Sequence, residues 1–140
     1  MTAEEMWKHS GLAGEYDAWS FGDDTDGLAA LVRAGIKTAT CSAYDLYEIE
    51  DEGLPQAGDT SVILDSRDEA VCIIRTTRVY TVPFDGVSAE HAFREGEGDR
   101  SLKYWRKVHE AFFKDELASA GLEFSGNSRV VCEEFEVVYS

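Results

Sequence analysis

Prolines, cysteines and long apolar runs are all scarce in this sequence. Only Pro55 and Pro83 occur, and no linker divides the 140 residues, so we expect one compact domain spanning 1–140. The three cysteines lie far apart without a CxxC pair, which argues against a zinc site or a disulfide framework. No run of roughly eighteen apolar residues exists, so we expect no membrane span. The first residues lack the basic-then-apolar layout of a signal peptide, and we expect a cytoplasmic protein.

Basic residues are scarce as well. The chain holds 13 lysines and arginines against 28 aspartates and glutamates, which gives a net charge of −15. Binding to a duplex depends on neutralising phosphates with basic side chains, so we expect no binding to extended duplex DNA. A nucleoside or a short single-stranded RNA is repelled less and is the partner we expect. Apolar residues make up 44% of the chain, which is enough to bury a core and argues against disorder.

Helical and strand-like patterns follow one another in the first half of the chain. Residues 24–35 predict a helix with capping residues at its start and Gly35 at its end. Residues 38–50 mix β-branched and aromatic side chains, which indicates a strand. Residues 60–66 and 70–84 predict two more strands joined by a hairpin turn.

The second half predicts two helices and a last strand. Residues 88–121 are helical at both ends, with Ser88 and Ser101 as N-caps and glycines between the helices. Alternating apolar residues at 129–139 predict the strand. Separated strands with few crossover helices favour an α+β domain built on a mostly antiparallel, barrel-like sheet.

The motif GxKxxT occurs at Gly35, Lys37 and Thr40, where the first predicted helix leads into a strand. It is not a P-loop, because the order GxxxxGK[ST] is absent. At a bend, Lys37 and Thr40 can reach one cleft, where a partly buried lysine can lose its proton, act as a base and polarise a hydroxyl. A solvated lysine in a threonine-rich strand would have the same spacing.

The segment REGEGDRS, residues 94–101, is dense in charge and contains two glycines. Glu95 and Glu97 can serve as acid or base, or can hold Lys37 by ion pairing. A polar loop between two helices would also carry carboxylates here, because the helix dipole favours them near a helix N-terminus.

Aromatic and basic side chains come together at residues 102–109. Lys103, Trp105 and Arg106 are the types that stack on a base and hold a phosphate. Trp105 also has the helical spacing of a core residue. Trp19 and Phe21, in WSFGDD, can form a cleft wall or a hydrophobic staple before the first helix.

Ser128 and the histidines complete the polar candidates. Ser128 precedes the last strand and is either a turn residue or a hydroxyl that lines the cleft. We find no spacing shared between carboxylates and His9, His91 or His109, so we expect no metal site.

Several segments together resemble the ASCH domain family, whose fold is a small β-barrel related to the PUA fold of RNA-binding proteins. The resemblance covers nearly the whole length and rests on AWSFGD (18–23), LVRAGIKTATCS (31–42), LPQAGD (54–59), EHAFREGEGDRSLKYWRKVHEAFF (90–113) and VVCEEFEVVY (130–139). It implies a PUA-like, mostly antiparallel β-barrel flanked by helices, with a cleft beside the helix that precedes GxKxxT. Family members are proposed to bind RNA or nucleotides in that cleft.

The resemblance also implies which residues act. Some similar proteins hydrolyse an acylated cytidine nucleoside with a lysine, a threonine and a glutamate, which are here Lys37, Thr40 and Glu95, with Glu97 as a rival. Lys37 would deprotonate Thr40 or a water for attack on an amide carbonyl, and Glu95 would relay the proton or orient the lysine. Ser42 stands where one family variant has arginine, and the missing cation weakens phosphate binding there.

Three hypotheses follow for the function. The first is a hydrolase of an acylated nucleoside that needs no cofactor; its base would stack on Trp19, Phe21 and Trp105, and Lys103 or Arg106 would meet a phosphate or hydroxyl. The second is a ribonuclease on single-stranded RNA, which in similar proteins depends on a divalent metal. The third is a non-catalytic RNA- or nucleotide-binding module.

Overall fold

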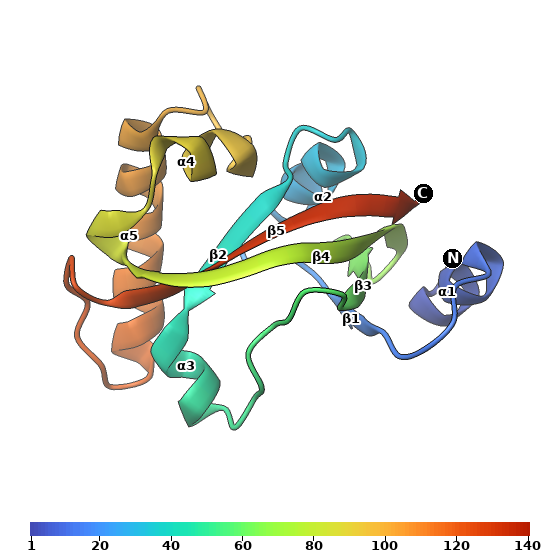
Figure 1. The fold of residues 1–140 in the computed structure, drawn as a ribbon, viewed down its shortest axis with the longest axis horizontal. Helices are drawn as coiled ribbons and strands as arrows, with labels where there is room; N and C mark the ends of the chain where they lie inside the picture. Colours follow the sequence, from blue (N-terminus) through green and yellow to red (C-terminus); the bar gives the residue numbers. More distant parts are fainter.

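A five-stranded sheet in the order β1-β3-β4-β5-β2 organises the chain, and the computed structural model describes all of residues 1–140. Figure 1 shows that the sheet curls, with the long strands β4 and β5 crossing the molecule, α4 and α5 at one end and α1 at the other. The strands are β1 (Asp17–Trp19), β2 (Ala39–Ala43), β3 (Thr60–Leu64), β4 (Ala70–Pro83) and β5 (Arg129–Tyr139). The helices are α1 (Ala3–Ser10), α2 (Thr25–Arg33), α3 (Tyr44–Ile49), α4 (Ala89–Glu95) and α5 (Leu102–Ser119), with a 3-10 turn at Phe84–Gly86.

The α+β class is confirmed, and the sheet is antiparallel except at one edge. Strand β1 pairs with β3 in parallel, while β3–β4, β4–β5 and β5–β2 are antiparallel. The register between β4 and β5 shifts at Ile73/Ile74 and again at Thr76/Arg78. Bulges of this kind bend a strand and increase its twist, which accounts for the curl of the sheet.

The predicted helix ends are confirmed for α4 and α5. The Ser88 hydroxyl accepts a hydrogen bond from the His91 amide, and the Ser101 hydroxyl accepts one from the Tyr104 amide. Each cap satisfies a backbone N–H that has no partner inside the helix. No helix is both long enough and apolar enough to cross a bilayer.

The predicted strand over residues 38–50 is confirmed only for its first half. Strand β2 ends at Ala43, and Tyr44–Ile49 form helix α3. From this helix Leu46 packs against the core, so tertiary packing outweighs the strand preference of the β-branched and aromatic residues there. Helix α1 and the short strand β1 were not predicted.

Two hydrophobic clusters pack against the sheet. One lies between α5 and the sheet and includes Trp105 and Phe113. The other lies under α2 and includes Val32 and Phe21. A third cluster packs α1 against β3 and β4. The polar residues described next contact both of the first two clusters, since Glu95 accepts from Trp105 and Lys37 lies over the ring of Phe21.

Candidate functional site

Lys37 lies in the bend between α2 and β2, and its side chain is only 1% exposed. Gly35 ends the helix with φ of +76°, and the amides of Ile36 and Lys37 both donate to the Leu31 carbonyl. A left-handed residue at this position is the usual helix ending, and glycine adopts it without steric cost. The ending turns the chain inward, so the lysine side chain enters the protein.

The end of α4 is fastened to the same bend. The Thr38 amide donates to the Arg94 carbonyl at 2.7 Å. Gly96 adopts φ of +73°, and a Cβ on it would lie 2.7 Å from the Ile36 carbonyl oxygen. Only glycine allows this close approach, which places the two carboxylates on either side of Gly96 next to Lys37.

Glu95 is the centre of a buried hydrogen-bond network. Its Oε1 lies 3.1 Å from Lys37 Nζ and 3.5 Å from His109 Nε2. Its Oε2 lies 2.7 Å from His91 Nε2 and accepts from Trp105 Nε1 at 2.6 Å. A carboxylate that is 1% exposed keeps its charge only when such donors compensate the lost water. Burial opposes ionisation, but Lys37 and the histidines outweigh it and hold the pKa of Glu95 well below its usual range.

Lys37 is a cation in this arrangement. Its Nζ also lies 2.9 Å from Glu97 Oε2 and 5.5 Å from the centre of the Phe21 ring. Burial disfavours the ammonium, but the charges of Glu95 and Glu97 outweigh burial and raise the pKa of Lys37. Lys37 therefore cannot act as a base until it gives up a proton, and Glu97 is the nearer of its two carboxylates.

The surroundings of His109 favour its charged form. Its Nδ1 faces the Trp105 carbonyl at 2.9 Å while its Nε2 faces Glu95. Both partners are acceptors, and only imidazolium has two N–H donors. Burial lowers the pKa of His109, but hydrogen bonding to Glu95 and its charge outweigh burial and raise it.

Two adjoining cavities open at this network. The smaller, of about 250 Å³, is lined by Lys37, Glu95, Glu97 and His109 together with apolar residues of α2 and α5. The larger, of about 710 Å³, lies over the sheet between β1, α3 and α5. Both are lined by Phe21, Gly22, Thr40, Cys41 and Phe112. Thr40 therefore stands at their junction, and its hydroxyl makes no hydrogen bond within the protein.

The larger cavity is acidic. Five carboxyl side chains and no lysine or arginine line it: Asp17, Glu52, Asp59, Glu116 and Glu133. Burial raises the pKa of Glu133 to about 7, although the Thr76 hydroxyl opposes the shift. An anionic ligand would be repelled from these walls, whereas a neutral one with hydrogen-bond donors suits them.

Five of the predicted residues line the cavities besides Thr40 and Lys37. Trp19 and Phe21 form an edge-to-face aromatic pair with centres 5.0 Å apart on one wall. Ser42 lines the larger cavity, where its hydroxyl lies 2.6 Å from that of Tyr47. Glu95 and Glu97 line the smaller one. Trp105 is connected to the site only through its hydrogen bond to Glu95.

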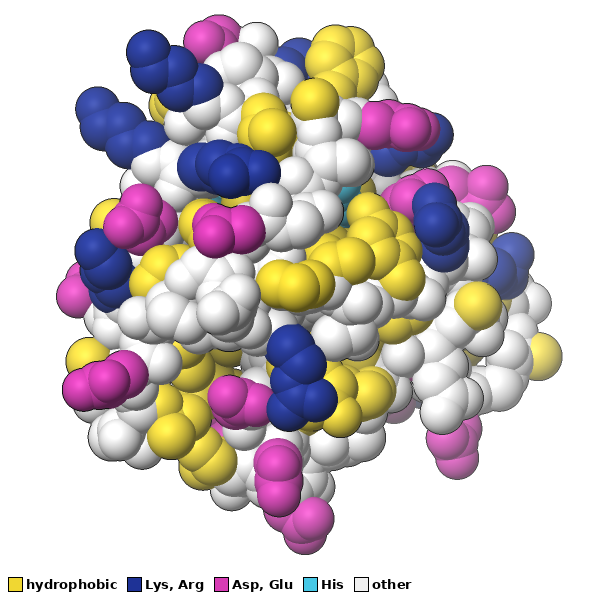
Figure 2. All heavy atoms as spheres, turned by 60° about the vertical axis from the view of Figure 1, so that its left-hand side comes forward, with side chains coloured by type: hydrophobic (Ala, Val, Ile, Leu, Met, Phe, Trp, Pro, Cys, Tyr) yellow, Lys and Arg dark blue, Asp and Glu magenta, His cyan; other side chains and the backbone are white.

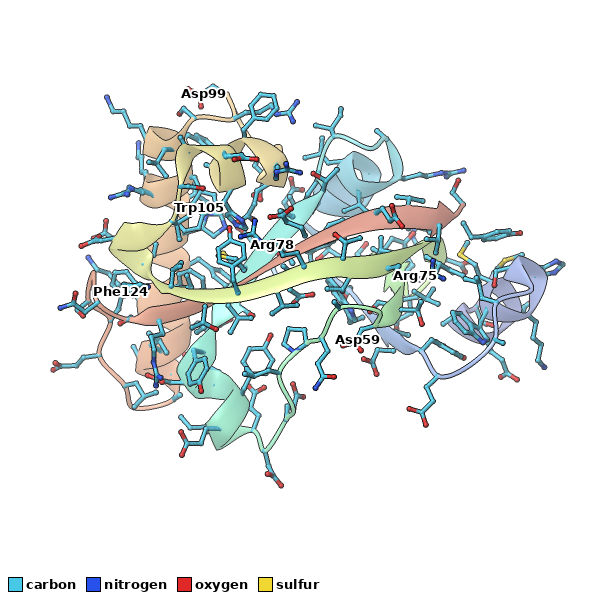
Figure 3. All side chains as sticks on the ribbon, in the orientation of Figure 1. Asp59, Arg75, Arg78, Asp99, Trp105 and Phe124 are labelled. Atoms are coloured by element: carbon cyan, nitrogen blue, oxygen red, sulfur yellow. The ribbon has the colours of Figure 1, made fainter.

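Neither cavity is lined by four residues that were predicted as ligand contacts: Lys103, Trp105, Arg106 and Ser128. Trp105 is 2% exposed and stacks on His109 with ring centres 4.3 Å apart, so it supports the network from the core. Figure 3 shows Trp105 on the α5 side of the sheet. Lys103 points to solvent, and Arg106 donates to the Asp85 carbonyl. Ser128 accepts a hydrogen bond from the Ser125 amide and is a turn residue.

Sequence reasoning missed His91, His109 and Glu133. The statement that no histidine shares a spacing with a carboxylate was wrong, because His91 and Glu95 are four residues apart on one face of α4. His109 stands four residues after Trp105 on α5, a helical spacing that predicts their stacking, but its contact with Glu95 joins two helices and left no local signal. No sequence pattern pointed to Glu133, because a second glutamate follows it in the strand and nothing in the sequence distinguishes the two.

The donor set does not fit a divalent metal. Ligand atoms of Glu95, Glu97 and His109 lie within 4.8 Å of one another, and so do those of Cys41, His91 and Glu95. The ammonium of Lys37 already contacts both glutamates of the first group, and a metal would face that cation. In the second group burial raises the pKa of the Cys41 thiol well above its usual value, which disfavours the thiolate that binds metal.

The chain belongs to the ASCH domain family, because the family model for the ASCH domain matches residues 17–139. No curated protein matches it. The ASCH domain from Lactobacillus crispatus JV V101 is similar in structure, with a TM-score of 0.92 and 30% identity over 98% of this chain and 94% of that one. A protein from Enterococcus faecalis V583 is 41% identical, with a TM-score of 0.87 over 97% of this chain and 87% of that one.

Proposed function

We propose that this chain binds a nucleoside in the two adjoining cavities and hydrolyses an acyl amide on its base, as in N4-acetylcytidine. The observation that carries the proposal is the position of Thr40. Its free hydroxyl stands between an aromatic-walled cavity large enough for a nucleoside and a buried lysine–glutamate pair. We also assign the curled sheet to the PUA-like folds, in which family members are thought to bind RNA or nucleotides.

The chemistry begins with a proton shift. Lys37 passes a proton to Glu97 across 2.9 Å and then accepts the proton of Thr40, whose oxygen attacks the amide carbonyl carbon. As the C–N bond breaks, its electron pair stays with nitrogen, and the leaving base takes up one proton. Water then attacks the acyl ester on Thr40 and releases one proton, which makes good the proton that the leaving base took up. The carboxylic acid leaves, and the proton held by Glu97 returns through Lys37 to the threonine oxygen.

This scheme divides the work between the two carboxylates. Glu95 is fully buried and accepts from four side chains, so it stays ionised and holds Lys37 in place. Glu97 is 17% exposed and has Lys37 as its only side-chain partner, so it is free to take a proton. Glu97 is therefore the proton acceptor and Glu95 the positioning residue.

Hydrolysis of N4-acetylcytidine, followed by chromatography of cytidine, tests the proposal. Thr40→Val keeps the shape of the side chain without the hydroxyl, and Lys37→Ala removes the base; we expect both to abolish turnover while the melting temperature changes little for Thr40→Val. Thr77→Val is the matched control, because Thr77 lies on the exposed side of β4. Wild-type protein that is inactive on a panel of acylated nucleosides, or Thr40→Val with full activity, would refute the proposal.

A ribonuclease or a non-catalytic RNA-binding module would use the same cavities. The net charge of −15 and the absence of lysine and arginine from the larger cavity both disfavour a polyanion. Figure 2 shows basic and acidic side chains interspersed on one face without a broad basic surface. Labelled single-stranded RNA, incubated with and without divalent metal, separates these alternatives, and we expect neither cleavage nor tight binding.

A further inference from the structure

Glu133 lies directly opposite Thr40. The two residues are paired across β5 and β2. Opposite residues of an antiparallel pair point to the same face of the sheet, with Cβ atoms about 4.5–5.5 Å apart. Both side chains line the larger cavity, so a carboxyl group stands beside the hydroxyl that we propose as the nucleophile.

Interactions within the folded protein do not account for a carboxyl group at this position. Its only hydrogen bond is a long one, 3.4 Å, from the Thr76 hydroxyl. No cation lines the cavity, and the other charged groups around it are the carboxylates of Asp17, Glu52, Asp59 and Glu116. The remaining titratable groups of the lining are Tyr47, whose hydroxyl bonds Ser42, and the thiol of Cys41, whose pKa is raised by burial. A half-buried acid without a strong partner costs stability, which points to a ligand that satisfies it.

We propose that Glu133 recognises the base and acts as the acid of the reaction: its carboxyl group pairs with the N3 and N4 edge of an acylated cytosine and gives its proton to N3 as the C–N bond breaks. The inference rests on the proposed function. A neutral carboxyl group has one donor and one acceptor side by side, and this edge offers an acceptor at N3 and a donor at N4. The raised pKa of Glu133, about 7, keeps much of the group protonated near neutral pH.

The proton count closes over one turnover. Protonation at N3 lets cytosine leave as its neutral imino tautomer, which carries the electron pair of the broken bond on N4 and returns to the amino form in solution. Glu133, now a carboxylate, takes a proton from the water that attacks the ester on Thr40. The ester oxygen recovers its own proton from Lys37, which is replenished by Glu97. Both glutamates are thereby restored, and the net reaction consumes one water.

Two substitutions separate recognition from proton transfer. Glu133→Gln keeps a donor and an acceptor but has no proton to give, so we expect the Kd for cytidine to stay within about threefold and kcat for N4-acetylcytidine to fall about 100-fold or more. Glu133→Leu removes both groups, and we expect cytidine to bind about tenfold or more weakly. Glu136→Gln, an exposed carboxylate of the same strand that lines neither cavity, is the matched control and should change neither constant.

Calorimetry with cytidine measures recognition without any turnover. Glu133→Leu that binds cytidine as wild type does would overturn the recognition role, and Glu133→Gln with wild-type kcat would overturn the proton transfer. Wild-type protein that binds cytidine but hydrolyses no acyl amide would refute the proposed function and the transfer step together. In that case a weaker affinity of Glu133→Leu would still support recognition of the base by Glu133.

Discussion

Glu95→Gln is the substitution with the largest expected effect on stability. The wild-type carboxylate accepts from His91 and Trp105 on one oxygen and faces Lys37 and His109 on the other. Glutamine has one acceptor oxygen and one NH2 group. In either orientation the NH2 group faces two N–H donors, and the charge that balances Lys37 and His109 is lost.

The expected loss of stability follows from these unpaired donors and charges. Removing one partner from a buried ion pair costs about 3–5 kcal/mol, because it leaves a charge in a medium that cannot solvate it. Domains of this size have unfolding free energies of about 5–15 kcal/mol, so Glu95→Gln should remove a large share of the total. The pKa of Glu95 is depressed, so its contribution is present above the ordinary carboxyl pKa and is lost as pH falls through the folded value.

Urea unfolding at neutral and acidic pH measures this loss. Glu134→Gln is the matched control, since its partners Arg78 and Arg94 are exposed and such pairs contribute at most about 1 kcal/mol. Lys37→Met in the Glu95→Gln background should recover part of the loss, because it removes the stranded cation. A Glu95→Gln variant within about 0.5 kcal/mol of wild type would refute a buried charge network at this position.

Three further predictions use the same network and cavities. Gly96→Ala should destabilise the protein by at least about 1 kcal/mol more than Gly11→Ala in urea unfolding, since both glycines have φ of +73° but only Gly96 would place its Cβ against backbone; equal losses would contradict this. The raised pKa of His109 contributes stability that is present below its ordinary value and is lost as pH rises through the folded value. We expect the unfolding free energy of the wild type to fall between about pH 6 and pH 9, and that of His109→Asn to show no such decline. Cytidine 5′-monophosphate should bind more weakly than cytidine in calorimetry, because the larger cavity is lined by carboxylates; equal affinities would count against that charge effect.

Much of the fold could be predicted from local patterns. The hairpin of β3 and β4, the last strand and the serine caps of α4 and α5 all depend on residues close in sequence. Residues 44–49 could not be assigned, because a core contact of Leu46 decides their conformation. The parallel pairing of β1 with β3 joins segments more than forty residues apart and leaves no local signal.

The candidate site was predicted in part. The motif residues Lys37 and Thr40 and the segment with Glu95 and Glu97 were recognised as separate pieces, and the structure brings them to one place. Adjacent residues of a strand face opposite sides of a sheet, so only the strand register shows that Glu133, and not Glu134, lies on the same face as Thr40. Trp105 fitted both a ligand contact and a core position, and packing against His109 decided for the core.

The sequence by itself determined the charge, the α+β class, the family and the short motifs, because each depends on composition or on neighbours along the chain. Only the tertiary structure decided the state of Lys37. Its charge is set by burial and by carboxylates that stand 58 and 60 residues further along the chain, and a pKa depends on which groups are near in space. Lys37, which the motif suggested as a base, is held as a cation. The Thr40 hydroxyl lies opposite Glu133, a residue that belongs to none of the motifs.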